Sequence, residues 1–207
     1  LDELPEFKRD ALEAMRQPLE DGRVTVSRAS VKHTYPADFM LVASMNPCPC
    51  GYFGDRSGKC RCTPYQIKNY LSRISGPFLN RIDVMWEVSR PKFSELRDKA
   101  PAESSEQIRK RVNAARDIQK KRYEGTGIFS NAQLSGALLE KYCKIDAEGE
   151  YILKAAFNSM NLSARAYKRI LTVARTIADL AGENNISAAH IGEAIQFRAL
   201  DRKYWGD

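Results

Sequence analysis

The apolar positions of the first twenty residues recur at helical spacing. The repeat runs from Phe7 to Met15. Pro5 stands at a favourable first-turn position, and Pro18 is expected to end the helix because proline lacks an N–H donor. The pattern therefore predicts one helix that begins near Pro5 and ends before Pro18.

The segment that follows has strand patterns. An alternation at 24–26 and a run at 31–35 predict a β-hairpin that turns near residues 29–30. Residues 39–43 (Phe-Met-Leu-Val-Ala) form a continuous apolar run, which is typical of a strand buried on both faces of a parallel sheet. Residues 84–88 are a second strand candidate, so the first 90 residues are expected to form an α/β region.

The last third of the chain has helical signals alone. Ser163 is expected to cap a helix that ends at Gly182, and Ser187 is expected to cap another helix. A further amphipathic helix is expected near 147–159, and three such helices can pack into a small bundle. The chain therefore divides into an α/β region at 1–90, a charged helical linker at 91–129 and an all-α domain at 130–207.

The composition is that of an ordinary globular protein. The chain has 207 residues, of which 43% are hydrophobic and 29% charged, which is enough for a real core. It has no apolar run of the ~18–20 residues that span a bilayer, so no membrane partner is expected. It also begins without Met or a signal peptide, and we expect a cytoplasmic protein of which this chain is a fragment.

The charge is positive and uneven. The formal net charge is +7. Residues 109–122 contain seven Lys or Arg against the single acid Asp117, and residues 56–73 contain five and no acid. Such patches suit a polyanion such as nucleic acid or nucleotide, although a solvated helix face has the same composition.

Asp2 and Glu3 are the first residues with candidate chemistry. An Asp-Glu pair at the end of a strand, followed by a helix, suits the second half of a nucleotide-hydrolysis site. The Asp would hold Mg²⁺ through water and the Glu would polarise the attacking water. Adjacent acids at a helix start also favour the helix dipole, which is the alternative.

Three further polar residues could complete such a site. Asn46 follows the predicted strand at 39–43 and could orient the attacking water, or could simply be a turn residue. Arg81 could reach a neighbouring subunit's phosphate, or could pair with Asp83 or another local acid. Arg165, in a first helical turn where a cation is unfavourable, could bind a phosphate or lie exposed.

Four of the five cysteines lie within fifteen residues, as Cys48-x-Cys50 and Cys60-x-Cys62. Four thiolates suit tetrahedral Zn²⁺, and a site with four protein ligands is structural because no position remains for water. The C-x-C arms are tighter than the usual C-x₂-C, so four free thiols are the alternative. Cys143 stands apart and is expected in a core.

Four motifs in order carry a family resemblance. The chain resembles the magnesium-chelatase-like AAA+ ATPases, in the branch that includes ComM and YifB, through LDELPEF at 1–7, MNPCPCG at 45–51, SGPFLNRID at 75–83 and LSARAY at 162–167. The resemblance covers nearly the whole chain. It implies the C-terminal part of a P-loop NTPase core, with an incomplete parallel sheet, a β-hairpin and a Cys-rich loop, followed by an α-helical lid.

The resemblance also implies roles, which fit ATP with Mg²⁺ as cofactors. Asp2 and Glu3 would be the Walker B pair, Asn46 sensor 1, Arg81 an arginine finger and Arg165 sensor 2. It further implies that the hairpin at 24–35 enters the pore of a hexameric ring. Its basic residues would then touch DNA: Arg23, Arg28 and Lys32.

Two functions are compatible with this resemblance. One is a helicase that drives branch migration during natural transformation, and the other is the motor subunit of a magnesium-chelatase complex. The family's phosphate-binding loop, G-x-x-x-x-G-K-[ST], does not occur, since the segment 54–60 is one residue short and has Cys in place of Ser or Thr. We therefore expect that these 207 residues alone do not hydrolyse ATP.

Overall fold

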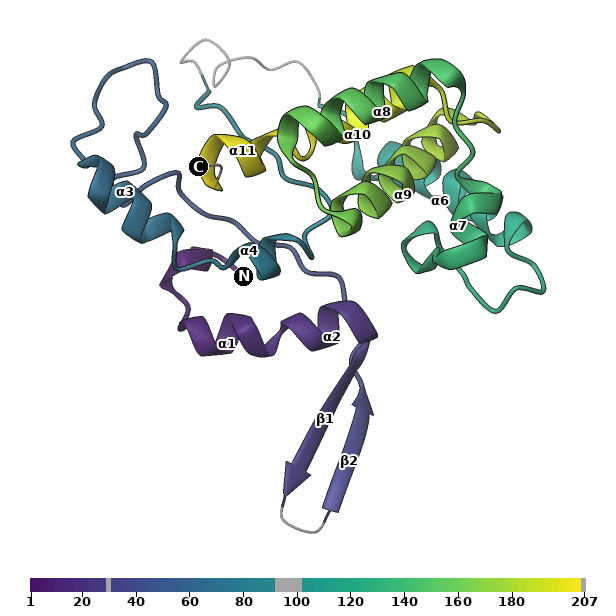
Figure 1. Ribbon diagram of the computed structural model, residues 1–207, viewed down its shortest axis with the longest axis horizontal. Helices are drawn as coiled ribbons and strands as arrows, with labels where there is room; N and C mark the ends of the chain where they lie inside the picture. Colours follow the sequence, from purple (N-terminus) through teal and green to yellow (C-terminus); the bar gives the residue numbers. More distant parts are fainter. Residues whose placement is uncertain (29–30, 92–101, 206–207) are drawn as a thin grey trace. The chain divides into compact units, whose positions relative to one another are not determined.

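A computed structural model describes residues 1–28, 31–91 and 102–205, which form two compact units (Figure 1). Unit 1 comprises Leu1–Ile82 and Asp201–Asp207, and unit 2 comprises Asp83–Leu200. The hairpin turn predicted at 29–30 and the linker residues 92–101 lie outside the described residues.

Unit 1 begins with three short helical elements: η1 (Leu4–Glu6), α1 (Arg9–Ala14) and α2 (Arg16–Asp21). The prediction of one helix that ends before Pro18 is therefore wrong. Pro18 is the third residue of α2, and a proline is tolerated there because the first-turn N–H groups have no partner within the helix. The helix ends at Gly22, whose φ of 64° is left-handed.

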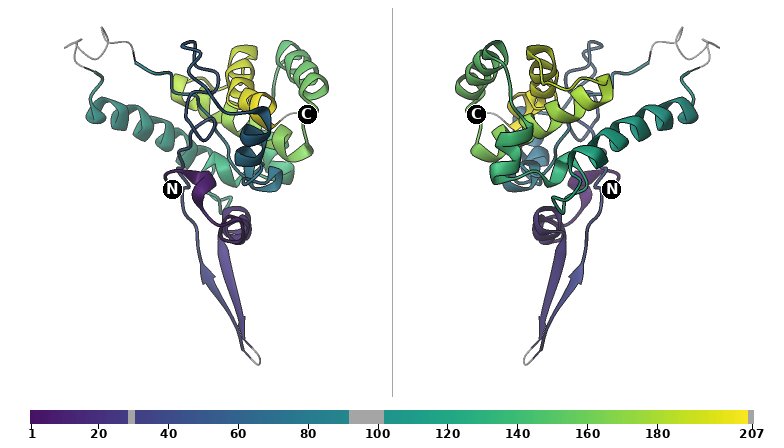
Figure 2. Two further views of the ribbon diagram at one scale, coloured as in Figure 1. Left: turned by 90° about the vertical axis from the view of Figure 1, so that its left-hand side faces the viewer. Right: turned by 90° about the vertical axis from the view of Figure 1, so that its right-hand side faces the viewer.

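The predicted hairpin is confirmed. Strand β1 (Arg23–Arg28) pairs antiparallel with β2 (Val31–Pro36), in a register that joins Arg23 to Pro36 and Arg28 to Val31. Figures 1 and 2 show the two strands running out from the end of α2, and nearly all of their residues are exposed. The hairpin is the single sheet among the described residues.

The strands predicted at 39–43 and 84–88 do not form, so the expected parallel sheet is absent from the described part of the chain. Segment 39–43 is nevertheless extended and meets the start of the chain. The terminal amino group of Leu1 donates to the Val42 carbonyl at 2.7 Å, and the Ser44 N–H donates to the Leu1 carbonyl at 2.8 Å. This is the hydrogen-bond pattern of neighbouring parallel strands, but a sheet needs further neighbours, and Met40 remains 87% exposed.

The rest of unit 1 packs around short helices: α3 (Pro64–Leu71), α4 (Gly76–Leu79) and the unit 1 residues of α11 (Ala199–Trp205). Thr63 caps α3 with a reciprocal capping box. The buried residues of this unit come from several of its elements: Leu4, Pro5, Leu12, Cys48, Tyr70, Leu71, Ile74, Phe78 and Leu79.

The main elements of unit 2 in its described residues are helices: α6 (Ser105–Arg122), η2 (Asn131–Gln133), α7 (Gly136–Tyr142), α8 (Ala147–Met160), α9 (Ala164–Ala181) and α10 (Ala188–Gln196). The predicted helices near 147–159, after Ser163 and after Ser187 are confirmed. Their apolar faces enclose one core, which includes Leu153, Ile170 and Ile191. In the described residues, none of the helices is long and apolar enough to cross a membrane.

A buried charge network joins α6 and η2 to α9 in unit 2. The Asp179 carboxylate is fully buried and accepts two hydrogen bonds from Arg122, at 2.8 and 2.5 Å, and one from Asn131 at 2.8 Å. Arg175 donates to the same carboxylate at 3.1 Å and to the carbonyls of Glu183 and Asn184 beyond the end of α9.

Candidate nucleotide and metal sites

Asp2 lies where segment 1–4 runs beside segment 42–44. The Ser44 hydroxyl donates a hydrogen bond to the Asp2 carboxylate, and the Glu3 backbone N–H donates to the same oxygen at 3.1 Å. These two bonds, Ser44 first, lower the pKa of Asp2 below its usual value. Asp2 is therefore an oriented, exposed carboxylate, which suits Mg²⁺ or the water bound to it.

Glu3 interrupts this pairing with a left-handed backbone, at φ 52° and ψ 52°. In a regular parallel ladder the Glu3 N–H would donate to the Ser44 carbonyl, but the Leu4 N–H does so instead, at 2.9 Å. Glu3 thus forms a one-residue bulge. Such a backbone costs about 1–3 kcal/mol and is found preferentially at functional sites, where bulges re-aim side chains.

Asn46 is exposed and follows the paired segment by two residues. Its side-chain amide lies beside Gly51 in the first turn of the Cys-rich loop, since a Cβ on Gly51 would be 3.7 Å from the Asn46 Oδ1. Because the two paired segments are parallel, their carboxyl ends lie at the same edge. The structure therefore brings Asp2, Glu3 and Asn46 to one edge of unit 1.

Arg81 is held against α2. Its Nε donates to the Arg16 carbonyl at 3.0 Å, its Nη1 donates to the Pro77 carbonyl at 2.6 Å, and its Nη2 forms an ion pair with Glu20. The side chain is 8% exposed. Arg81 thus forms an ion pair, as the alternative interpretation expected, but its acid is the distant Glu20 rather than Asp83 or another local acid.

Arg165 lies in unit 2, in the first turn of α9, and is exposed. The predicted cap is confirmed, because the Ser163 Oγ accepts a hydrogen bond from the Ala166 N–H at 3.2 Å. One turn further along α9, Arg169 forms an ion pair with Asp83. The five predicted site residues are thus divided, with Arg165 in unit 2 and the other four in unit 1.

The three basic residues of the hairpin are exposed and occupy both of its faces. Residues paired across antiparallel strands share a face, and faces alternate along each strand. Arg23 and Lys32 therefore lie on a polar face with Thr25, Ser27 and Thr34. Arg28 lies on the opposite face with the apolar and aromatic residues Val24, Val26, Val31, His33 and Tyr35.

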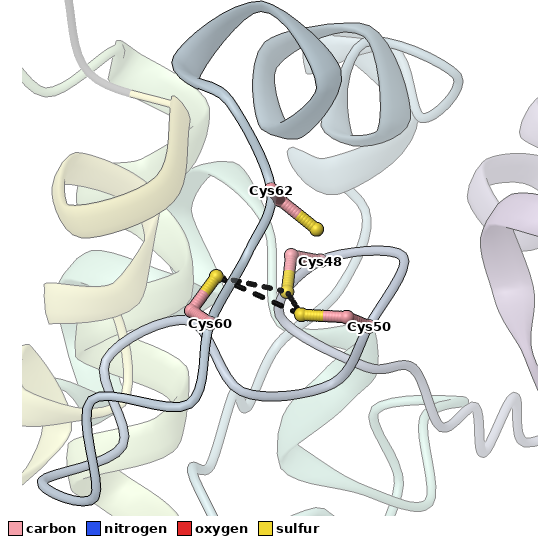
Figure 3. A group of neighbouring side chains, drawn as sticks. All are labelled: Cys48, Cys50, Cys60 and Cys62. Carbon is pink, nitrogen blue, oxygen red and sulfur yellow. Dashed lines mark hydrogen bonds between the residues drawn. The ribbon is translucent and has the colours of Figure 1, made fainter.

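The four clustered cysteines converge from the two ends of one loop (Figure 3). All four sulfur atoms lie within 4.8 Å of one another. The Cys48 sulfur is 3.4 Å from that of Cys50 and 3.9 Å from that of Cys60, and the Cys50 and Cys60 sulfurs are 3.7 Å apart. A tetrahedral zinc with Zn–S bonds of about 2.3 Å places its sulfurs about 3.8 Å apart, so the four residues fit such an ion.

Backbone N–H groups of the loop point at these sulfurs. Hydrogen bonds from the backbone of Arg61 and then of Tyr52 lower the pKa of Cys50 to about 6. Burial, by contrast, raises the pKa of Cys62 to about 12. Four close thiolates repel one another, and a divalent cation at their centre removes that cost, so the arrangement suits a metal ion. All five cysteines are free of disulfides.

Two family models match the chain in succession. The one described as magnesium chelatase, subunit ChlI, matches residues 1–96, and the one described as the C-terminal part of that subunit matches residues 102–198. The chain belongs to the magnesium-chelatase-like AAA+ family.

The relatives of this magnesium-chelatase-like chain include bacterial proteins of known name. It is 45% identical over 203 residues to competence protein ComM of Haemophilus influenzae and 43% identical over 203 residues to the uncharacterized protein YifB of Escherichia coli. It is also 36% identical over 198 residues to an uncharacterized protein of Mycobacterium tuberculosis. These matches cover 98%, 98% and 96% of this chain, and each covers 39% of the relative.

Sequence reasoning missed four residues that contact the predicted site. Ser44 binds Asp2, Glu20 binds Arg81, and Gly51 and Tyr70 adjoin Asn46. Ser44 could have been found by pairing segment 1–4 with the segment before Asn46, because this pairing places Ser44 beside Asp2. Glu20 has no sequence signal, because it is distant from Arg81 along the chain.

Proposed function

We propose that this chain supplies part of the ATP-hydrolysis site of a ring-forming AAA+ motor. The observation that carries this proposal is the parallel pairing of Leu1 with the segment before Ser44, which sets the Asp2 carboxylate and Asn46 at one edge. Family membership supports the same reading.

Each residue has a distinct role in this proposal. Asp2 holds Mg²⁺ through water, Glu3 polarises the attacking water and Asn46 orients it. Arg81 leaves its ion pair with Glu20 and binds the nucleotide phosphate of a neighbouring subunit. Arg165, which lies in α9 of the helical unit, binds a phosphate of the nucleotide. The backbone cradle and the lysine of the phosphate-binding loop come from sequence outside these 207 residues, in keeping with the 39% of each relative that the chain spans.

We propose DNA as the substrate of a hexameric ring in the cytoplasm, as in a branch-migration helicase of natural transformation. The exposed hairpin with Arg23, Arg28 and Lys32 and the net charge of +7 favour a polyanion. The relative named competence protein in Haemophilus influenzae favours the same role. The alternative is the motor of a metal-insertion complex, which the description of the family models favours.

We propose that the four cysteines bind one structural Zn²⁺. The spacing of their sulfurs and the backbone N–H groups directed at them support this assignment. Zinc has no open coordination position there, so the ion would fix the shape of the loop and take no part in hydrolysis.

The test is ATP turnover and branch migration by the complete protein, with and without DNA. We expect DNA to stimulate turnover, Glu3→Gln to abolish it while ATP still binds, and DNA binding to weaken steeply with salt. The triple variant of Arg23, Arg28 and Lys32 to Ala should lose DNA stimulation but keep basal turnover. Turnover that is indifferent to DNA and needs partner proteins would contradict the DNA motor and support the metal-insertion alternative.

A further inference from the structure

The first end of the Cys-rich loop folds back onto Asn46. Cys48 follows Asn46 by two residues and is fully buried. Gly51 has a φ of 76°, and a Cβ there would lie 3.7 Å from the Asn46 Oδ1 and 3.8 Å from its Cγ. Gly51 therefore lies next to the exposed side chain of Asn46, and only a glycine adopts this backbone without strain.

The second end of the loop reaches Asn46 through α3. Cys62 directly precedes Thr63, the N-cap of α3, so the position of Cys62 sets where this helix begins. Tyr70, two turns along α3, is 7% exposed, and its hydroxyl interacts with the Asn46 backbone. Burial is the largest cause of the raised pKa of Tyr70, which the hydrogen bond with Asn46 partly offsets.

The segment between these contacts, residues 37–63, contains no helix or strand. Two backbone hydrogen bonds to segment 1–4, and one from the terminal amino group of Leu1, hold residues 42–44. From 47 to 62, the long-range contacts include the convergence of the four sulfurs and the edge-on ring contact of Phe53 with Tyr204.

From these contacts we infer that the metal centre of Cys48, Cys50, Cys60 and Cys62 positions Asn46, and so sets the rate of ATP hydrolysis without setting ATP affinity. The inference rests on the proposed function and on the proposed zinc. A metal ion bound to the four sulfurs joins the two ends of the loop. The joined ends keep Gly51 and Tyr70 in contact with Asn46. A misplacement of about 1 Å at a positioning residue costs on the order of 100-fold in rate.

The first arm of the test needs no catalysis. In the complete protein, Cys60→Ser should reduce bound zinc from one equivalent to well under one, and should speed hydrogen exchange at residues 45–51 by at least about tenfold. Exchange in the hairpin at 23–36 should not change. Ser57→Ala, an exposed change in the same loop, is the matched control and should keep both zinc and slow exchange.

The second arm measures turnover. Cys60→Ser should lower kcat at least about tenfold while ATP affinity stays within about threefold. Tyr70→Phe keeps the cysteines and removes only the hydroxyl, so it should lower kcat by a smaller factor with zinc retained. Tyr65→Phe, on the exposed side of the same helix, should leave kcat unchanged.

The inference is overturned if the wild-type protein binds well under one equivalent of zinc, or if zinc is lost and exchange at 45–51 stays slow. It is also overturned if Cys60→Ser leaves kcat unchanged. A wild-type protein that binds zinc but hydrolyses no ATP would contradict the proposed function, and the exchange measurement would still decide whether the metal positions Asn46.

Discussion

The helices α6 to α10 of unit 2 enclose a common apolar core, whereas segment 39–43 of unit 1 leaves apolar side chains exposed beside the candidate site. Ile170, Ala174 and Ala178 are almost fully buried along α9, but Phe39 and Val42 are 44% and 71% exposed. A helix satisfies its own backbone hydrogen bonds, so helices can close a core by side-chain packing alone, while a strand needs a neighbouring strand to pair with. The residues with candidate chemistry thus lie mostly on the less enclosed unit.

The largest expected loss of stability in unit 2 comes from removing its buried carboxylate. Asp179→Ala leaves Arg122 and Arg175 buried without their anion, and should lower the free energy of unfolding by about 3–5 kcal/mol. Urea unfolding followed by circular dichroism measures this loss.

Asp117→Ala, on the exposed side of α6, is the control and should change stability by less than about 0.5 kcal/mol. The pH dependence adds a second check. Burial raises the pKa of Asp179, but the hydrogen bonds from Arg122 and Asn131 bring it below the ordinary value of 3.8. Its stabilising effect should therefore be complete above that value and fade as pH falls further. Equal losses for the two variants would contradict the buried network.

The same truncation in each unit tests their difference in packing. Leu153 in α8 and Leu12 in α1 are both 2% exposed. Leu153→Ala should cost about 3–5 kcal/mol because the helices around it relax little, and Leu12→Ala about 2–3 kcal/mol because the open unit can collapse around the cavity. Hydrogen exchange of the two helices measures each loss locally. A larger loss at Leu12 would reverse the comparison.

The loss of a helix cap should cost the same stability in the two units. Ser163→Ala in unit 2 and Thr63→Ala in unit 1 each remove a side-chain acceptor from a helix start, and each should cost about 1 kcal/mol. Capping is a local interaction, so it does not depend on how well the core is closed. Exchange rates in the first turns of α9 and α3 provide the measurement, and a loss confined to one unit would show that capping depends on tertiary closure.

The same physical contrast explains what the sequence predicted. The caps at Ser163 and Ser187 and the left-handed Gly182 act within a few residues, and the helices that they bound were predicted correctly. Pro18 was misinterpreted because its effect depends on its distance from the helix start. The run at 39–43 was misassigned because a strand is completed by partners distant in sequence.

In the candidate site, too, local features could be predicted from the sequence, whereas contacts between distant segments could not. The convergence of the four cysteines followed from their spacing, since two C-x-C arms in one loop can share an ion. The contacts of Asp2 with Ser44 and of Arg81 with Glu20 could not be predicted, because each depends on a pairing between distant segments. The bulge at Glu3 is likewise a product of that pairing.

The most direct test of the proposed hydrolysis site is an Mg²⁺ titration of ATP turnover by the complete protein. Asp2→Asn keeps the shape of the side chain and removes the charge that Ser44 orients. We predict a fall in turnover of at least about 100-fold, with a smaller fall and a higher Mg²⁺ requirement for Ser44→Ala. Turnover by Asp2→Asn within about twofold of the wild type, at the same Mg²⁺ requirement, would contradict the account.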